Sequence, residues 1–146
     1  MCFDTDILWR PEYDSPEDDY RAFRDLGLRV AAHIAQAGRP IVLMAGGVPE
    51  QFEASPERRY FSEILYLALV CDDAVLVRRL RARPTWRQSG SPHVIEQERS
   101  FNRWLSANAS TTVPPMTVLD TSATSEQDTV RRVAAWVRGK APSNRR

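Results

Sequence analysis

The sequence predicts a single α/β domain, built as a doubly wound parallel sheet with helices on both faces. Three short apolar runs carry this prediction, at residues 41–45, 64–70 and 113–119. The runs are apolar at nearly every position, with Thr117 as the polar exception in the third, as expected of strands that are buried on both faces. Segments with helical periodicity separate the runs, and strands that alternate with helices favour a parallel sheet.

Capping residues and prolines predict the positions of the first helices. Cys2 and Phe3 read as the last residues of a strand whose beginning is absent. Ser15 and Pro16 form an N-cap and first-turn pair, and the apolar face that follows them predicts one long amphipathic helix. Pro49 and Pro56 stand at the two ends of residues 49–56, and this segment is predicted to form a short helical region before the second apolar run.

Capping residues and an apolar stripe predict the positions of the later helices. Asp72 and Asp73 stop the strand of residues 64–70 and are placed to cap a basic helix. Ser125 and Asp128 form an approximate capping box for the last helix. The apolar stripe expected on that last helix consists of Val130, Val133, Ala134 and Val137.

The amino-acid composition argues against several classes of function. The 20 basic and 19 acidic side chains nearly balance, which gives no case for a general nucleic-acid or membrane surface. No apolar run approaches 18 residues, and the two cysteines, Cys2 and Cys71, do not suggest a disulfide framework. Neither His33 nor His93 has metal ligands at a suitable spacing, so we expect no metal site. These features predict a cytoplasmic protein.

A family resemblance rests on residues 64–105. An apolar strand is followed by Asp72-Asp73, by R-R-L-R-A-R-P-x-W-R and then by N-R-W-L. This order resembles the lid half of P-loop nucleoside and nucleotide kinases, especially the AAA-type kinase-like ATPases of actinobacteria. The resemblance extends from Cys2 to about Val137. It implies an incomplete domain of the P-loop nucleotide kinase type over residues 1–138, with a lid at about 83–92 and a flexible tail at 139–146.

The resemblance also implies roles for individual residues. Arg83 and Arg87 match the lid arginines that close over ATP phosphates, whereas Arg78, Arg79 and Arg81 fit a solvated helix face. Asp4 and Asp6 match carboxylates that face the small-molecule phosphate acceptor, with capping of a turn as the alternative. Asp120, Thr121 and Ser122 match the loop that touches adenine, with an ordinary turn as the alternative. The implied cofactors are ATP and Mg²⁺.

The phosphate-binding loop of these kinases does not occur in this sequence. None of the six glycines begins G-x-x-x-x-G-K-[ST], and the only lysine is Lys140. In the resembling family that motif follows the central strand, so the first strand, the P-loop and the first helix are all missing here. We therefore expect an N-terminally truncated form that is inactive by itself. The alternative is a non-catalytic remnant that binds a partner or itself through the exposed sheet.

Overall fold

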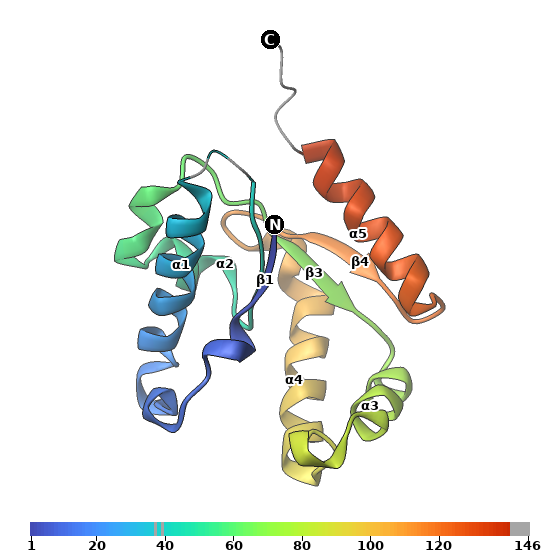
Figure 1. The fold of residues 1–146 in the computed structure, drawn as a ribbon. Helices are drawn as coiled ribbons and strands as arrows, with labels where there is room; N and C mark the ends of the chain where they lie inside the picture. The colour runs from blue at the N-terminus through green and yellow to red at the C-terminus, as the bar shows by residue number, and fades with distance from the viewer. Residues whose placement is uncertain (37, 39, 141–146) are drawn as a thin grey trace. The chain divides into compact units, whose positions relative to one another are not determined.

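The computed structural model describes residues 1–36, 38 and 40–140. The chain divides into two compact units, and each is considered by itself. Unit 1 contains Met1–Leu65 and Thr112–Pro114, and unit 2 contains the remaining residues. In Figure 1 unit 1 covers the blue to green part of the ribbon, and unit 2 covers most of the green to red part. Most of the tail expected at residues 139–146 lies outside the described residues.

Unit 1 places one long helix beside a small parallel sheet. Its regular elements are β1 (Cys2–Asp4), α1 (Arg21–Ala35), β2 (Val42–Met44) and α2 (Pro49–Glu53). Strands β1 and β2 pair in parallel, and Phe3 lies opposite Leu43. At the end of β1, the hydroxyl of Thr5 donates to the carbonyl of Met44 (3.1 Å). Gly27 of α1 lies against Thr5, because a Cβ at residue 27 would stand only 3.0 Å from the Thr5 methyl group.

The helix predicted to begin at Ser15 and Pro16 begins later in the structure. Residues Pro16–Asp18 form a 3₁₀ turn, and α1 starts only at Arg21. Asp19 and Tyr20 separate the two elements with φ values of 58° and 56°. These are left-handed conformations, which interrupt a right-handed helix. The predicted helix start at Ser15 was therefore wrong by about two turns.

Unit 2 contains the other three long helices. Its elements are β3 (Leu67–Val70), α3 (Asp73–Ala82), α4 (Pro92–Asn108), β4 (Thr117–Asp120) and α5 (Glu126–Lys140). Strands β3 and β4 pair in parallel, with Leu67 opposite Thr117. The predicted cap at Ser125 is confirmed, because its hydroxyl oxygen accepts from the amide of Asp128 (3.1 Å). The predicted apolar stripe of α5 is only partly buried: Val133, Ala134 and Val137 are half-buried, and Val130 is 61% exposed.

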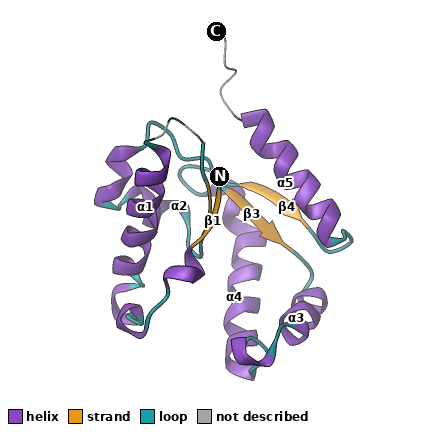
Figure 2. Ribbon diagram, in the orientation of Figure 1, coloured by secondary structure: helices purple, strands orange, loops and turns teal. Residues whose placement is uncertain are grey.

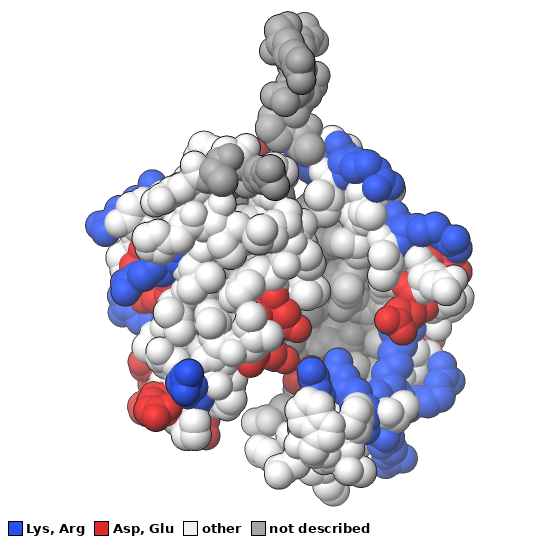
Figure 3. Space-filling model, in the orientation of Figure 1, with Lys and Arg blue, Asp and Glu red and all other residues white. Residues whose placement is uncertain are grey.

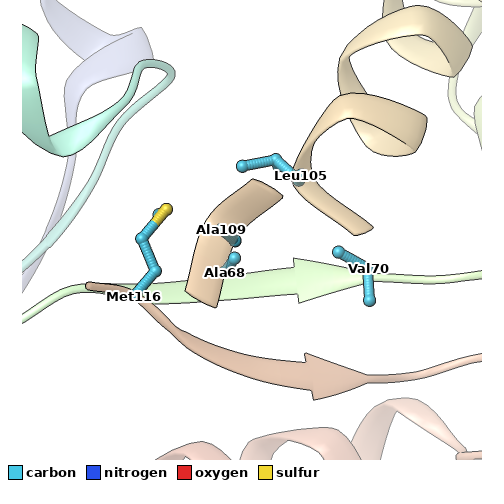
Figure 4. Packing of buried hydrophobic residues seen from close by; sticks show 5 residues of the cluster. All are labelled: Ala68, Val70, Leu105, Ala109 and Met116. Atoms are coloured by element: carbon cyan, nitrogen blue, oxygen red, sulfur yellow. The ribbon is translucent and has the colours of Figure 1, made fainter. Parts of the chain in front are cut away.

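The core of unit 2 lies between β3 and the C-terminal part of α4. Figure 4 shows its buried side chains, which come from both elements and from the segments that follow α4. The members of this cluster are Ala68, Val70, Leu105, Ala109 and Met116. Tyr66 and Phe101 are partly buried and pack against it. The alternate residues of β3, Ala68 and Val70, face α4, so this face of the short sheet is the one that holds the unit together.

The predicted doubly wound parallel sheet was wrong. The structure has two separate sheets of two strands each, β1 with β2 and β3 with β4, and most of the described chain is helical (Figure 2). The apolar runs are longer than the strands that form, since only Leu67–Val70 of residues 64–70 and Thr117–Asp120 near residues 113–119 are paired. Pro114 and Pro115 have no N–H group for a ladder, which delays the start of β4.

Candidate functional site

The carboxyl ends of β3 and β4 bring two polar loops together in unit 2. The amide and the hydroxyl of Thr121 both donate to the carbonyl of Val70, at 2.8 and 3.0 Å. The amide of Asp72 donates to the hydroxyl oxygen of Ser122 (2.8 Å). The loop after β3 and the loop after β4 are thus joined by hydrogen bonds.

Arg79 of α3 holds the loop that follows β4. Its guanidinium donates to the hydroxyl and to the carbonyl of Thr121, both at 2.8 Å, and to the carbonyl of Thr124 at 3.4 Å. Arg79 is exposed, as expected of a solvated helix face, but its guanidinium also binds this loop. Its partners lie 42 and 45 residues later in the chain, so no local pattern distinguishes Arg79 from the arginines beside it.

Asp120 and Ser122 organise the start of the same loop. The carboxylate of Asp120 accepts from the hydroxyl of Ser122 (2.6 Å) and from its backbone amide (2.8 Å). These two bonds favour the charged carboxylate, so they lower the pKa of Asp120. Arg132 of α5 donates to the Asp120 carbonyl (2.8 Å). The residues predicted to touch adenine form a hydrogen-bonded turn at the strand end.

Asn102 of α4 closes the end of β3. Its side-chain oxygen accepts from the amide of Cys71 (3.1 Å), and its side-chain nitrogen donates to the carbonyl of Cys71 (2.7 Å). The carboxamide thus occupies the position of a neighbouring strand's peptide group. Burial raises the pKa of the Cys71 thiol, and the nearby charge of Arg79 opposes that shift. Sequence reasoning missed the role of Asn102, whose partner lies 31 residues away.

The two predicted lid arginines lie on an exposed loop of unit 2. Arg83 follows the last residue of α3, and Arg87 stacks on Trp86 with its guanidinium 5.2 Å from the ring centre. The loop is anchored by Ser89, whose hydroxyl donates to the carbonyl of Leu80 (3.1 Å) and which is 7% exposed. Within the described residues, Arg83 has no ion pair with a carboxylate.

Asp4 and Asp6 lie in unit 1, whereas the other predicted site residues lie in unit 2. The carboxylate of Asp4 accepts from the amide of Asp6 (3.0 Å) and so caps the 3₁₀ turn Thr5–Leu8. The geometry of Asp4 is therefore that of the turn-capping alternative. The residue that ties this turn to the sheet is the buried Thr5, which sequence reasoning did not select.

Three further findings concern metal binding, membrane spans and known relatives. Across residues 1–36, 38 and 40–140, no group of three or more His, Cys, Asp or Glu side chains is arranged to hold a metal ion. Over the same part of the chain, every helix is too short or too polar to cross a membrane. Comparison with protein-family models, with curated proteins and with solved structures found no match to this chain.

Proposed function

We propose that unit 2 is the nucleotide-binding part of an ATP-dependent phosphotransferase that resembles nucleoside and nucleotide kinases. The observation that supports this most is the clamp of Arg79 on Thr121, which fixes a polar loop at the shared carboxyl edge of β3 and β4. Nucleotides bind at such edges in parallel α/β proteins. In this proposal the adenine lies against the loop of Asp120, Thr121 and Ser122.

Phosphate binding is assigned to the exposed loop between α3 and α4. Arg83 and Arg87 are both exposed there and carry the planar guanidinium groups that bind phosphate oxygens in pairs. The surrounding segment is basic, since residues 72–103 contain seven arginines and four acidic side chains. Figure 3 shows the blue side chains gathered over α3. A trianionic or tetraanionic ligand would be attracted to this part of unit 2.

The sequence lacks the phosphate-binding loop of the kinases that it resembles. It contains no G-x-x-x-x-G-K-[ST], and Arg83 and Arg87 alone do not position a γ-phosphate for transfer. We therefore expect weak ATP binding and negligible turnover. In this proposal magnesium is bound by the phosphates of ATP. The acceptor is a small molecule, and we place the protein in the cytoplasm because both of its cysteines are free thiols.

Calorimetric titration with MgATP tests the proposal. We expect a dissociation constant on the order of 1 mM, which corresponds to about 4 kcal/mol. Arg83→Ala and Arg87→Ala should each weaken ATP binding by roughly threefold to tenfold, because each removes a charge-assisted contact on an exposed loop. AMP binding should change less, since AMP lacks the outer phosphates.

Arg131→Ala is the matched control for this titration. Arg131 is an exposed arginine of α5 in the same unit and forms its ion pair with Asp128. If Arg131→Ala weakens ATP binding as much as Arg83→Ala and Arg87→Ala do, the attraction is a general effect of positive charge. The assignment of phosphate to the lid arginines would then be wrong.

A second candidate function is self-association through the edge of β3 that pairs with no strand among the described residues. Tyr66 and Val70 direct their carbonyls to β4, where they accept from the amides of Thr117 and Thr121 (2.9 and 2.8 Å). The peptide groups of Leu67 and Leu69 therefore point the opposite way, to the unpaired edge. This strand has no charge, lysine or proline to protect that edge, and Leu69 is 48% exposed. We propose a second copy of the chain as the occupant.

A twofold axis would pair the two copies of β3 as antiparallel strands. Leu67 of one copy would then lie opposite Leu69 of the other, and the outward peptide groups of both residues would be paired. Leu69→Pro removes the outward N–H but keeps the pairing with β4, so it should abolish dimers in sedimentation velocity. Leu69→Ala keeps the N–H and should still dimerise. Equal dimer fractions for the wild type and Leu69→Pro would exclude this edge as the interface.

A further inference from the structure

A groove runs between α3 and α4 of unit 2. It has a volume of about 640 Å³, which lies within the range of small-molecule sites. Its lining residues are Asp73, Ala74, Val77, Arg78 and Arg81 of α3 and Arg99 of α4. The small aliphatic side chains of Ala74 and Val77 give it an apolar surface, and arginines from both helices stand around that surface. Neither Arg83 nor Arg87 lines the groove.

The one acidic side chain of the groove is already neutralised. The carboxylate of Asp73 accepts from Nε and Nη2 of Arg99, at 3.2 and 3.1 Å. It also accepts from Nε of Arg103, at 2.9 Å. These bonds, with those from Arg103 the strongest cause, lower the pKa of Asp73. Asp73 therefore stays ionised and paired, and it does not repel an anion that enters the groove.

Two arginines of the groove have no acidic partner. Across the described part of the chain, neither Arg78 nor Arg81 forms an ion pair or a side-chain hydrogen bond. Arg99, by contrast, is held by Asp73 and by Glu96. Arg78 and Arg81 are three residues apart on one helix, so their side chains lie on the same side of α3. They form a pair of exposed like charges that a bound anion would stabilise.

We infer that the groove between α3 and α4 binds a phosphate monoester with an apolar body, whose phosphate is bound by Arg78 and Arg81 and whose body contacts Ala74 and Val77. Guanidinium groups match the oxygens of a phosphate in pairs, and the aliphatic side chains of the groove offer contact area only to an apolar group. Such a ligand contacts the arginines and the aliphatic side chains of the groove at the same time. This site is separate from the proposed ATP site, because it uses different arginines.

Phenyl phosphate is a suitable probe, because it combines a phosphate monoester with an apolar ring and contains no adenine. Titration of ¹⁵N-labelled protein, followed by amide chemical shifts, should give shifts at Ala74, Val77 and Arg81. Binding of phenyl phosphate should be about threefold to tenfold tighter than binding of inorganic phosphate, from the burial of one face of the ring. Phenol, which has the ring without the charge, should not bind detectably.

Paired variants separate the two parts of the groove. Arg78→Ala and Arg81→Ala should each weaken phenyl phosphate binding by roughly fivefold, because each removes a charge-assisted contact. Val77→Ser should reduce the affinity for phenyl phosphate to that for inorganic phosphate. Both arginines are exposed on a helix, where alanine is well tolerated, so these variants should fold.

Arg131→Ala serves as the control outside the groove, and it should not change phenyl phosphate binding. Unchanged binding in Arg78→Ala and Arg81→Ala would overturn the inference, as would equal affinities for phenyl phosphate and inorganic phosphate. Because Arg83 and Arg87 do not line the groove, a failure of the ATP proposal leaves the expected shifts at Ala74, Val77 and Arg81 unaffected. The reverse also holds, since the ATP proposal is tested at the amides of Asp120, Thr121 and Ser122, which do not line the groove.

Discussion

Replacement of Leu105 by alanine is expected to lower the free energy of unfolding by about 2–4 kcal/mol. Leu105 is 8% exposed and lies in the cluster that joins α4 to β3 (Figure 4). Two of its neighbours, Ala68 and Ala109, have only a methyl side chain and cannot move into the space that Leu105 would leave. Of the surrounding side chains, the flexible Met116 is the best able to fill part of that cavity. Urea denaturation followed by circular dichroism measures the change.

Two variants control this prediction. Leu105→Met keeps most of the volume and should reduce stability by less than about 1.5 kcal/mol. Val130→Ala removes an aliphatic side chain that is 61% exposed on α5, so stability should change by no more than about 0.5 kcal/mol. If Leu105→Ala were as stable as Val130→Ala, the contact between α4 and β3 would not be the core of unit 2.

Replacement of Asn102 by alanine is expected to lower the free energy of unfolding by about 1–3 kcal/mol. The Asn102 side chain satisfies both the amide and the carbonyl of Cys71 at the unpaired edge of β3. Without it, two partly buried peptide groups lose their partners. The amide of Cys71 should also exchange its hydrogen with solvent faster, which NMR measures at that residue.

Asn108→Ala is the matched control on the same helix. The side chain of Asn108 donates only to the carbonyl of Trp104, within α4 itself (2.9 Å). Its removal should change stability by no more than about 0.5 kcal/mol and should leave the exchange of the Cys71 amide unchanged. Asn102→Asp keeps the acceptor for the Cys71 amide but loses the donor to its carbonyl. Its free energy of unfolding should therefore lie between those of the wild type and Asn102→Ala. Equal exchange in wild type and Asn102→Ala would contradict the account of this edge.

Local signals were sufficient to locate some elements of the fold. The apolar run at residues 64–70 contains β3, and Ser125 caps α5 as its spacing with Asp128 predicts. Such features depend on residues within one or two turns of each other, which a sequence displays directly. The left-handed residues Asp19 and Tyr20, which delay the start of α1, could not be predicted from the sequence, because neither residue type requires a left-handed backbone.

The sheet could not be predicted because strand pairing depends on contacts far apart in the chain. Apolar runs indicate which segments can be buried, but they do not fix how many residues pair or which strands become neighbours. The run at residues 41–45 therefore gives a strand of only three residues, and each sheet ends after two strands. Arg79 and Asn102 were missed for the same reason, since each acts on a loop more than 30 residues away.

The measurement that tests the central proposal most directly is the map of amide chemical shifts on addition of MgATP and of AMP. The proposal predicts that both ligands shift Asp120, Thr121 and Ser122, and that ATP alone also shifts Arg83 and Arg87. If ATP at about 10 mM, roughly ten times the expected dissociation constant, leaves all five amides unchanged, unit 2 does not bind nucleotide at the carboxyl edge of β3 and β4.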